Sequence, residues 1–348
     1  MREHQPRAIA ARRRMAGLSL VELMIAIAIG LVVMAALTTI FANSSRARQE
    51  LERNSRQIEN GRFAIELLAS DLRLAGFYGE FDPRAVAAPA ALQDPCSTDP
   101  LVWAAAFRLH VQGYDNGAGY PADCAFPSLK AGTDIVAIRR ASTCEAGVGS
   151  CPAAVGGYPY IQLSKCATEQ AATPYVLGLQ GAVAFPLRLR DCATTAGIRQ
   201  YYVRIYYIST DNGAALPSAV PTLKRRDFTG SGFVDTPLVE GIEEFNVEYG
   251  IDIDGDGLPD AYSADPTGYT CPSGCDPVSN WMNVVTARIY LLARNIDPSP
   301  GYTDVKTYNL GNDAGGAPIT VTPGGPYHRH AYTTLVRIVN AAQRRETP

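Results

Sequence analysis

One stretch of alternating acidic residues could bind a cation. Residues 252–260 read DIDGDGLPD, with acids at alternate positions around two glycines. Carboxylates and a backbone carbonyl gathered at a tight glycine turn supply the oxygen ligands that Ca²⁺ prefers. The sequence therefore predicts a calcium site with a small ligand set. The expected ligands are the side chains of Asp252, Asp254, Asp256 and Asp260 and the carbonyl oxygen of Leu258.

This loop lacks the bidentate acid that usually closes a calcium site, because Ser263 stands at that position. Asp265 would have to reach in to replace it. The alternative is a solvated, metal-free acidic turn between two strands. If calcium binds, we expect a dissociation constant on the order of 10⁻⁴–10⁻³ M and a role in rigidifying one edge of the domain.

The eight cysteines are a second group of residues that could do chemistry, and all of them lie from Cys96 onward. They allow 105 disulfide pairings, of which the sequential set closes the shortest loops and has the lowest entropic cost. Structural zinc is the alternative, although no Cys-x-x-Cys occurs. The sequential set pairs Cys96 with Cys124, Cys144 with Cys151, Cys166 with Cys192, and Cys271 with Cys275.

Catalytic machinery is hard to assemble from this sequence. After the N-terminal region the only histidines are His110, His328 and His330, and there is no nucleophile elbow or phosphate-binding glycine loop. The net charge of −3 and a pI of about 5.9 argue against nucleic acid as a partner. We therefore expect neither an enzyme nor a nucleic-acid-binding protein.

The N-terminal region contains an apolar stretch long enough to cross a membrane. Residues 23–45 carry no charge, and as a helix they would span about 34 Å. The arginines at 12–14 precede this stretch and should stay in the cytoplasm, so the chain that follows is exported and its cysteines are expected to be oxidised. Glu22 directly precedes this stretch, and a carboxylate in a membrane helix is unfavourable unless it pairs with a partner.

The helix is predicted to continue beyond the membrane to Ala75, with Gly76 as its stop. Leucine and isoleucine at 51, 58, 65 and 72, joined by Leu68 and Ala75, should form the face that packs on the rest of the chain. The 31 glycines and 24 prolines lie almost entirely after this helix and predict a head of strands and loops. The fold class is therefore α+β.

Six segments of the head have the composition of strands. The segment at 198–209 alternates well and has apolar residues on both faces, so we expect a central strand lying against the helix. The six are 133–139, 198–209, 222–228, 243–249, 284–293 and 332–340.

The stretch from Gly17 to Glu22, followed by the uncharged segment, resembles the signal of type IV prepilins. The resemblance implies that a prepilin peptidase cuts between Gly17 and Leu18 and methylates the new amino group of Leu18. It also implies that Glu22 pairs with the amino terminus of a neighbouring subunit during assembly, which would relieve two buried charges. A secretory signal peptide or a plain signal anchor would not explain Gly17 and Glu22 together.

Residues 60–77, NGRFAIELLASDLRLAGF, resemble the helix end of the PilW minor pilins, and shorter stretches at 132–136, 238–242, 249–252 and 335–338 are similar as well. The resemblance implies a pilin-like fold divided into four parts. These are a cleaved basic leader (1–17), a transmembrane and polymerisation half of the helix (18–45), an amphipathic half (46–76) and a periplasmic β-rich head (77–348).

A PilW-like minor pilin would be an inner-membrane precursor that matures into a subunit of the pilus tip. It would help to prime assembly and support twitching motility and adhesion. The implied partners are other minor pilins, the major pilin and a PilY-type tip adhesin. Two alternatives stay open: a type II secretion pseudopilin, which shares the signal, and a non-polymerising, membrane-anchored, calcium-dependent adhesin, which would need neither Gly17 nor Glu22.

Overall fold

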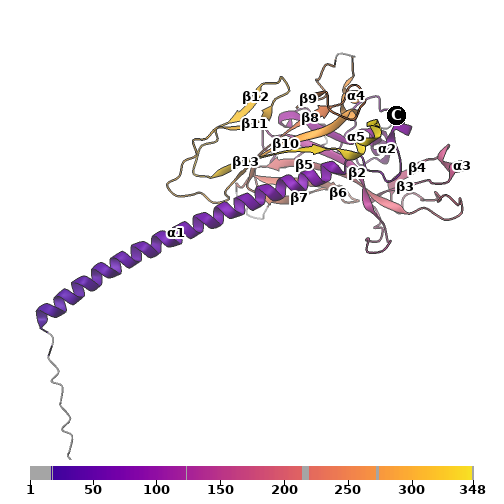
Figure 1. The fold of residues 1–348 in the computed structure, drawn as a ribbon. Helices are drawn as coiled ribbons and strands as arrows, with labels where there is room; N and C mark the ends of the chain where they lie inside the picture. Colours follow the sequence, from indigo (N-terminus) through magenta and orange to yellow (C-terminus); the bar gives the residue numbers. More distant parts are fainter. Residues whose placement is uncertain (1–16, 18, 123, 214–218, 272–273, 347–348) are drawn as a thin grey trace, which may run out of the picture. The chain divides into compact units, whose positions relative to one another are not determined.

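The computed structural model describes residues 17, 19–122, 124–213, 219–271 and 274–346, and the chain divides into two units, Met1–Glu52 and Arg53–Pro348. Helix α1 (Leu20–Arg73) belongs to both units (Figure 1). No proline interrupts it, and the predicted single long helix is present, although it ends at Arg73 rather than at Ala75. A long N-terminal helix followed by a β-rich head confirms the α+β prediction.

In the second unit, the final turns of α1 pack on the head through a face shifted from the predicted one. Leu68 and Leu72 are buried as expected, but Ile58 is 41% exposed, and Leu51 in the first unit is 68% exposed. The predicted face is wrong at these two positions because residues spaced by seven rotate by about 20° per repeat around a helix of 3.6 residues per turn. The buried face is instead formed by Gln57, Gly61, Ala64, Leu68, Ala69, Asp71 and Leu72.

Gly61 explains how the helix comes so close to the sheet beneath it. A Cβ atom at this position would lie 2.2 Å from Cε2 of Tyr332, so only glycine leaves room for that ring. The Tyr332 hydroxyl donates a hydrogen bond to the carbonyl of Ile58. The side-chain amide of Gln57 donates to the carbonyl of Ala293 at 2.9 Å, which ties the same helical turn to a second strand.

The larger sheet of the head is antiparallel and has seven strands. Strands β1-β2-β5-β3-β4 form its main path, β6 pairs with β5, and β7 pairs with β6. The predicted central strand is β5, which contacts three neighbours. The strands are β1 (Val111–Tyr114), β2 (Ile135–Glu145), β3 (Pro159–Leu163), β4 (Tyr175–Leu179), β5 (Ile198–Ser209), β6 (Thr222–Phe228) and β7 (Phe233–Glu240).

The second sheet has four antiparallel strands in the order β13-β10-β8-β9, and β11 and β12 form a separate hairpin. Its register places Ile289 opposite Val247 and Leu291 opposite Phe245, which brings apolar side chains together in the core. The strands are β8 (Ile242–Ile251), β9 (Ala261–Ser263), β10 (Val284–Arg294), β11 (Tyr308–Asn312), β12 (Pro318–Val321) and β13 (Arg329–Arg337).

The last predicted strand, 332–340, is partly wrong because helix α5 (Val339–Glu346) begins within it. This helix caps the end of α1, since Arg344 donates to the carbonyl of Gly76 at 2.9 Å and Asn340 donates to that of Ala75 at 3.3 Å. The remaining helical turns are short. They are η1 (Pro83–Ala85), α2 (Pro100–Ala105), η2 (Ala106–Arg108), η3 (Asp115–Gly117), α3 (Ala167–Gln170) and α4 (Pro277–Met282).

The main hydrophobic core joins the end of α1 to residues of both sheets. A second cluster is largely aromatic and includes Tyr78, which directly follows the end of the helix, with Trp103, Phe107 and Tyr201. Tyr78 and Phe107 meet edge to face with their ring centroids 4.8 Å apart. The chain segment that leaves α1 is therefore held firmly in the head.

Candidate functional site

The N-terminus of α1 is built around Ser19 and Glu22. The backbone N–H of Ser19 donates to Oε2 of Glu22 at 2.9 Å, and the N–H of Val21 donates to Oγ of Ser19 at 3.3 Å. This reciprocal arrangement is a capping box, which fixes where a helix begins. Gly17 lies outside the helix and is exposed, as a protease site requires, whereas Leu18 lies outside the described residues.

The apolar part of α1 exposes its side chains on all sides within the first unit. Leu31 is 66% exposed, Val32 70% and Phe41 76%. By length and composition this helix can cross a membrane. A helix that is apolar all round is not stable in water, so it needs lipid or neighbouring helices around it.

Asp71 forms a buried joint between α1 and the larger sheet. Its carboxylate accepts hydrogen bonds from Nε of Arg140 at 2.6 Å, Nη1 of Arg204 at 3.0 Å and the hydroxyl of Tyr206 at 2.8 Å. Burial by itself would raise the pKa of Asp71, but the two guanidinium groups and these hydrogen bonds outweigh it and lower the pKa. The carboxylate is therefore ionised and connects the helix to β2 and β5.

The acidic loop at 252–260 brings together three of its four predicted carboxylates. Oxygens of Asp252, Asp254 and Asp260 lie within 4.8 Å of one another. The carboxylate of Asp256 does not join this group and instead accepts from the N–H of Leu258 at 2.7 Å. The predicted ligand set is thus only partly assembled in the loop.

Asp252 also has a cationic partner that sequence inspection did not identify. It is fully buried, and its Oδ2 accepts from Nε of Arg345 at 2.5 Å and from the N–H of Gly257 at 2.9 Å. Its other oxygen accepts from the N–H of Gly255 at 2.6 Å. Arg345 lies on α5, 93 residues away along the chain, so no local pattern could have predicted the pair.

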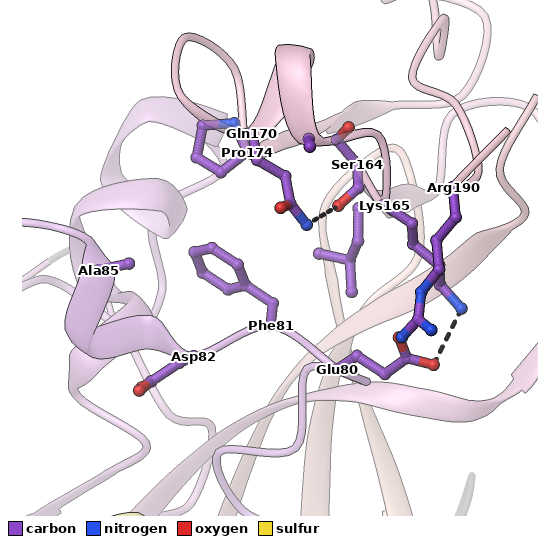
Figure 2. A pocket seen from close by; sticks show the side chains of 11 residues that line it. Glu80, Phe81, Asp82, Ala85, Ser164, Lys165, Gln170, Pro174 and Arg190 are labelled. Atoms are coloured by element: carbon purple, nitrogen blue, oxygen red, sulfur yellow. Dashed lines mark hydrogen bonds and ion pairs between the residues drawn. The ribbon is translucent and has the colours of Figure 1, made fainter. Parts of the chain in front are cut away.

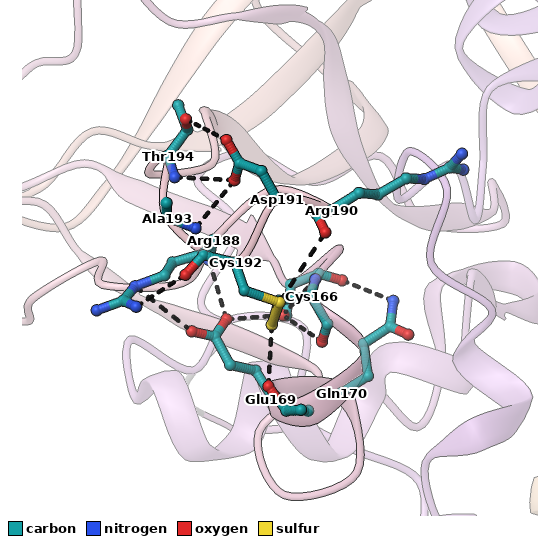
Figure 3. The surroundings of a disulfide bond; sticks show 11 residues. Cys166, Glu169, Gln170, Arg188, Arg190, Asp191, Cys192, Ala193 and Thr194 are labelled. Atoms are coloured by element: carbon teal, nitrogen blue, oxygen red, sulfur yellow. Dashed lines mark hydrogen bonds and ion pairs between the residues drawn. A yellow bond between two sulfur atoms is a disulfide. The ribbon is translucent and has the colours of Figure 1, made fainter.

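The eight cysteines are joined in sequence order. The four disulfides are Cys96–Cys124, Cys144–Cys151, Cys166–Cys192 and Cys271–Cys275. Three of them lie in the lobe formed by the larger sheet and its loops. Figure 3 shows the Cys166–Cys192 bond, which closes the loop that contains α3 and β4.

A hollow of about 840 Å³ lies beside this loop and next to the segment that leaves α1 (Figure 2). The side chains of Phe81 and Leu163 line it, and Lys165 forms an ion pair with Glu80 at 3.0 Å. Sequence inspection did not identify this hollow, because its two walls come from segments about 80 residues apart.

Two family models match the chain. Residues 12–38 match the model described as Prokaryotic N-terminal methylation motif, and residues 205–340 match the one described as Type IV Pilus-assembly protein W, or PilW. The second match begins within β5 and extends through the whole smaller sheet. A search of curated proteins and a search of solved structures returned no match.

The methylation motif on an apolar helix, followed by a β-rich head, defines a type IV pilin-like subunit. Such a subunit is anchored in the inner membrane as a precursor, is processed by a prepilin peptidase and is assembled with other pilins into a pilus. Within this class the chain is a PilW-like type IV minor pilin. Both matched families are pilus proteins rather than enzymes.

Proposed function

We propose that this pilin helps to prime pilus assembly and remains in the tip complex, where it supports adhesion and twitching motility. The observation that carries the proposal is the start of α1. The capping box at Ser19 and Glu22 is followed by residues 23–44, which are uncharged and exposed, and the same chain continues into a head with four disulfides. The helix can pack in a bundle with the N-terminal helices of other pilins. A head as large as residues 77–348 is difficult to fit at every subunit position along a narrow pilus shaft.

The proposed partners follow from the two parts of the chain. The helix would pack with the helices of other minor pilins and of the major pilin. The head would contact a large, PilY-type tip adhesin. A pseudopilin of type II secretion is the competing function, and the PilW match to the smaller sheet favours the pilus.

Processing and assembly test this proposal. Mass spectrometry of the mature chain should find N-methylated Leu18 as the first residue, and Gly17→Glu should leave the precursor uncut because the new side chain blocks the peptidase. Deletion of the gene should reduce surface pili without impairing type II secretion, and gold labelling should find the protein at pilus ends. A mature chain that still begins at Met1, or a secretion defect with normal piliation, would contradict it.

Calcium binding at the acidic loop is a second, separate proposal. The three gathered carboxylates of Asp252, Asp254 and Asp260 support it, and Arg345 opposes it because its guanidinium already neutralises part of their charge. Bound calcium would hold the loop closed and rigidify this end of the smaller sheet.

Thermal melts of the segment 53–348 test the calcium proposal. Calcium at millimolar concentration should raise the Tm relative to chelator, and the Asp254→Ala, Asp260→Ala double variant should abolish that increase. Arg345→Met should enlarge the calcium-dependent increase, because it removes the competing cation. If calcium does not change the Tm of either the natural chain or Arg345→Met, the calcium proposal is wrong and the loop is only an acidic turn.

A further inference from the structure

A small pocket beside α5 collects four arginines, and we call it the arginine pocket. It has a volume of about 60 Å³, which is room for about four or five groups the size of a water molecule. Arg84 comes from η1, Arg108 from η2, and Arg344 and Arg345 from α5. No carboxylate is among the described residues that line the pocket, so its walls are positively charged.

Three of the four arginines are held in place by hydrogen bonds. Arg344 donates to the carbonyl of Gly76 at 2.9 Å, and Arg84 donates to the carbonyl of Arg344. Arg345 donates to Oδ1 of Asn283 at 2.6 Å. Because these contacts fix the guanidinium groups before any ligand arrives, a ligand of the pocket would lose little of its binding free energy to ordering them.

Arg108 differs from the other three arginines. Its side chain is half-buried, and its guanidinium makes no hydrogen bond or ion pair with any residue that the structure describes. A guanidinium carries five N–H donors in a planar fork. Arg108 therefore offers the pocket both a positive charge and donors that no described group uses.

The acids next to the pocket do not cancel its charge. Asp82 pairs with Arg84 at 2.9 Å, and Asp252 pairs with Arg345. Arg108 has no such counter-charge in the described part of the chain, and the other acids of the 252–260 loop do not line the pocket. At least one positive charge is therefore left over.

His110 lines the same pocket and responds to its charge. Burial lowers the pKa of His110 to about 4, the carbonyls of Val284 and Arg108 raise it, and the charges of Arg344 and Arg345 lower it further. The two charged groups that act most strongly on this imidazole are thus both cations. Charge and geometry agree that the pocket is suited to an anion.

We propose that the arginine pocket binds one small oxyanion, a phosphate or a carboxylate group, with Arg108 as a direct ligand and the other three arginines around it. Both groups present paired oxygens to the planar donors of a guanidinium, and such charge-assisted hydrogen bonds are roughly twice as strong as neutral ones. The volume suits a single group of this size rather than a peptide segment. The four arginines lie outside both matched family segments, so neither match assigns them a role.

Thermal melts of the processed full chain in a non-ionic detergent test the binding. Sodium phosphate or sodium acetate at millimolar concentration should raise the Tm above its value in sodium chloride of equal ionic strength. Arg108→Gln should weaken the affinity about tenfold or more, and it should fold normally because the Arg108 guanidinium makes no described contact. The matched control Arg62→Gln removes an exposed guanidinium from α1 and should keep the full response.

Selective labelling of histidine locates the anion and compares its two sources. The ring resonance of His110 should shift when the anion is added, whereas those of His328 and His330, which do not line the pocket, should not. Tighter binding of phosphate than of acetate would identify free phosphate as the ligand, and the reverse would identify a carboxylate group.

Three results would overturn the inference. They are a Tm that neither anion raises, an Arg108→Gln chain that responds as strongly as Arg62→Gln, and a His110 resonance that does not shift. None of these measurements depends on pilus assembly, so failure of the anion site and failure of the proposed function can be told apart.

Discussion

Glu22 has two separable roles at the scale of single residues. It caps its own helix through the N–H of Ser19, and in the assembled pilus it is expected to pair with the amino terminus of a neighbouring subunit. Glu22→Gln keeps a hydrogen-bond acceptor for the cap but removes the charge. We therefore predict that Glu22→Gln is inserted and cleaved normally and yet is lost from sheared pili, as is Glu22→Ala.

Immunoblots of the membrane and sheared-pilus fractions measure this separation. If Glu22→Gln reached the pili as well as the natural chain while Glu22→Ala did not, the helix cap rather than the charge would be the requirement. Equal recovery of both variants would show that other contacts direct docking.

Asp71 should be the most sensitive polar residue of the helix–head joint. Asp71→Asn leaves the buried Arg140 without its counter-charge and leaves Arg204 with Asp227 alone, so we predict a loss of about 3 kcal/mol in the free energy of unfolding of the segment 53–348. Urea denaturation measures this loss. The matched control is Glu66→Gln, because Glu66 pairs with Arg73 on the exposed side of the same helix and should change stability by less than about 0.5 kcal/mol.

The same joint predicts a direction of pH dependence. The pKa of Asp71 in the folded chain lies below its ordinary value, so its stabilisation is present above about pH 4 and is lost as the pH falls through the folded pKa. Unfolding in urea at a series of pH values should therefore show a steeper acid loss for the natural chain than for Asp71→Asn. Parallel curves would show that the carboxylate does not carry this dependence.

At the scale of elements, the disulfides should differ in their contribution to stability. Cys166–Cys192 spans 26 residues and Cys271–Cys275 spans 4, and a longer loop restricts the unfolded chain more. Replacing the first pair by serine should therefore destabilise the head by about 1.5 kcal/mol more than replacing the second. Urea midpoints of the two double variants measure the difference, and equal midpoints would argue against this loop-entropy explanation.

At the scale of the whole molecule, export predicts a fully oxidised head. The structure has four disulfides and no free cysteine among the residues it describes. The intact mass of the periplasmic form should therefore rise by eight hydrogens upon reduction, and peptide mapping should recover the four pairs. Free thiols in the exported chain would contradict this prediction.

The sequence by itself determined the features that depend on neighbours along the chain. The uncharged segment and the spacing from Gly17 to Glu22 predicted the membrane helix and its processing signal, and the matched methylation motif agrees with both. Strands β5 and β6 have the predicted bounds because alternation of side chains is a local signal. The face of α1 was predicted less well, since a repeat of seven only approximates the helical period.

Only the tertiary structure decided which distant residues meet. The contacts of Asp71 with Arg140 and Arg204 span 69 and 133 residues, and Arg345 reaches Asp252 across 93. The hollow beside the Cys166–Cys192 loop likewise has walls from separate segments of the chain. Such contacts depend on how sheets and helices pack, which side-chain periodicity does not encode. The charged joint, the partner of the acidic loop and the hollow could therefore be found only in the folded molecule.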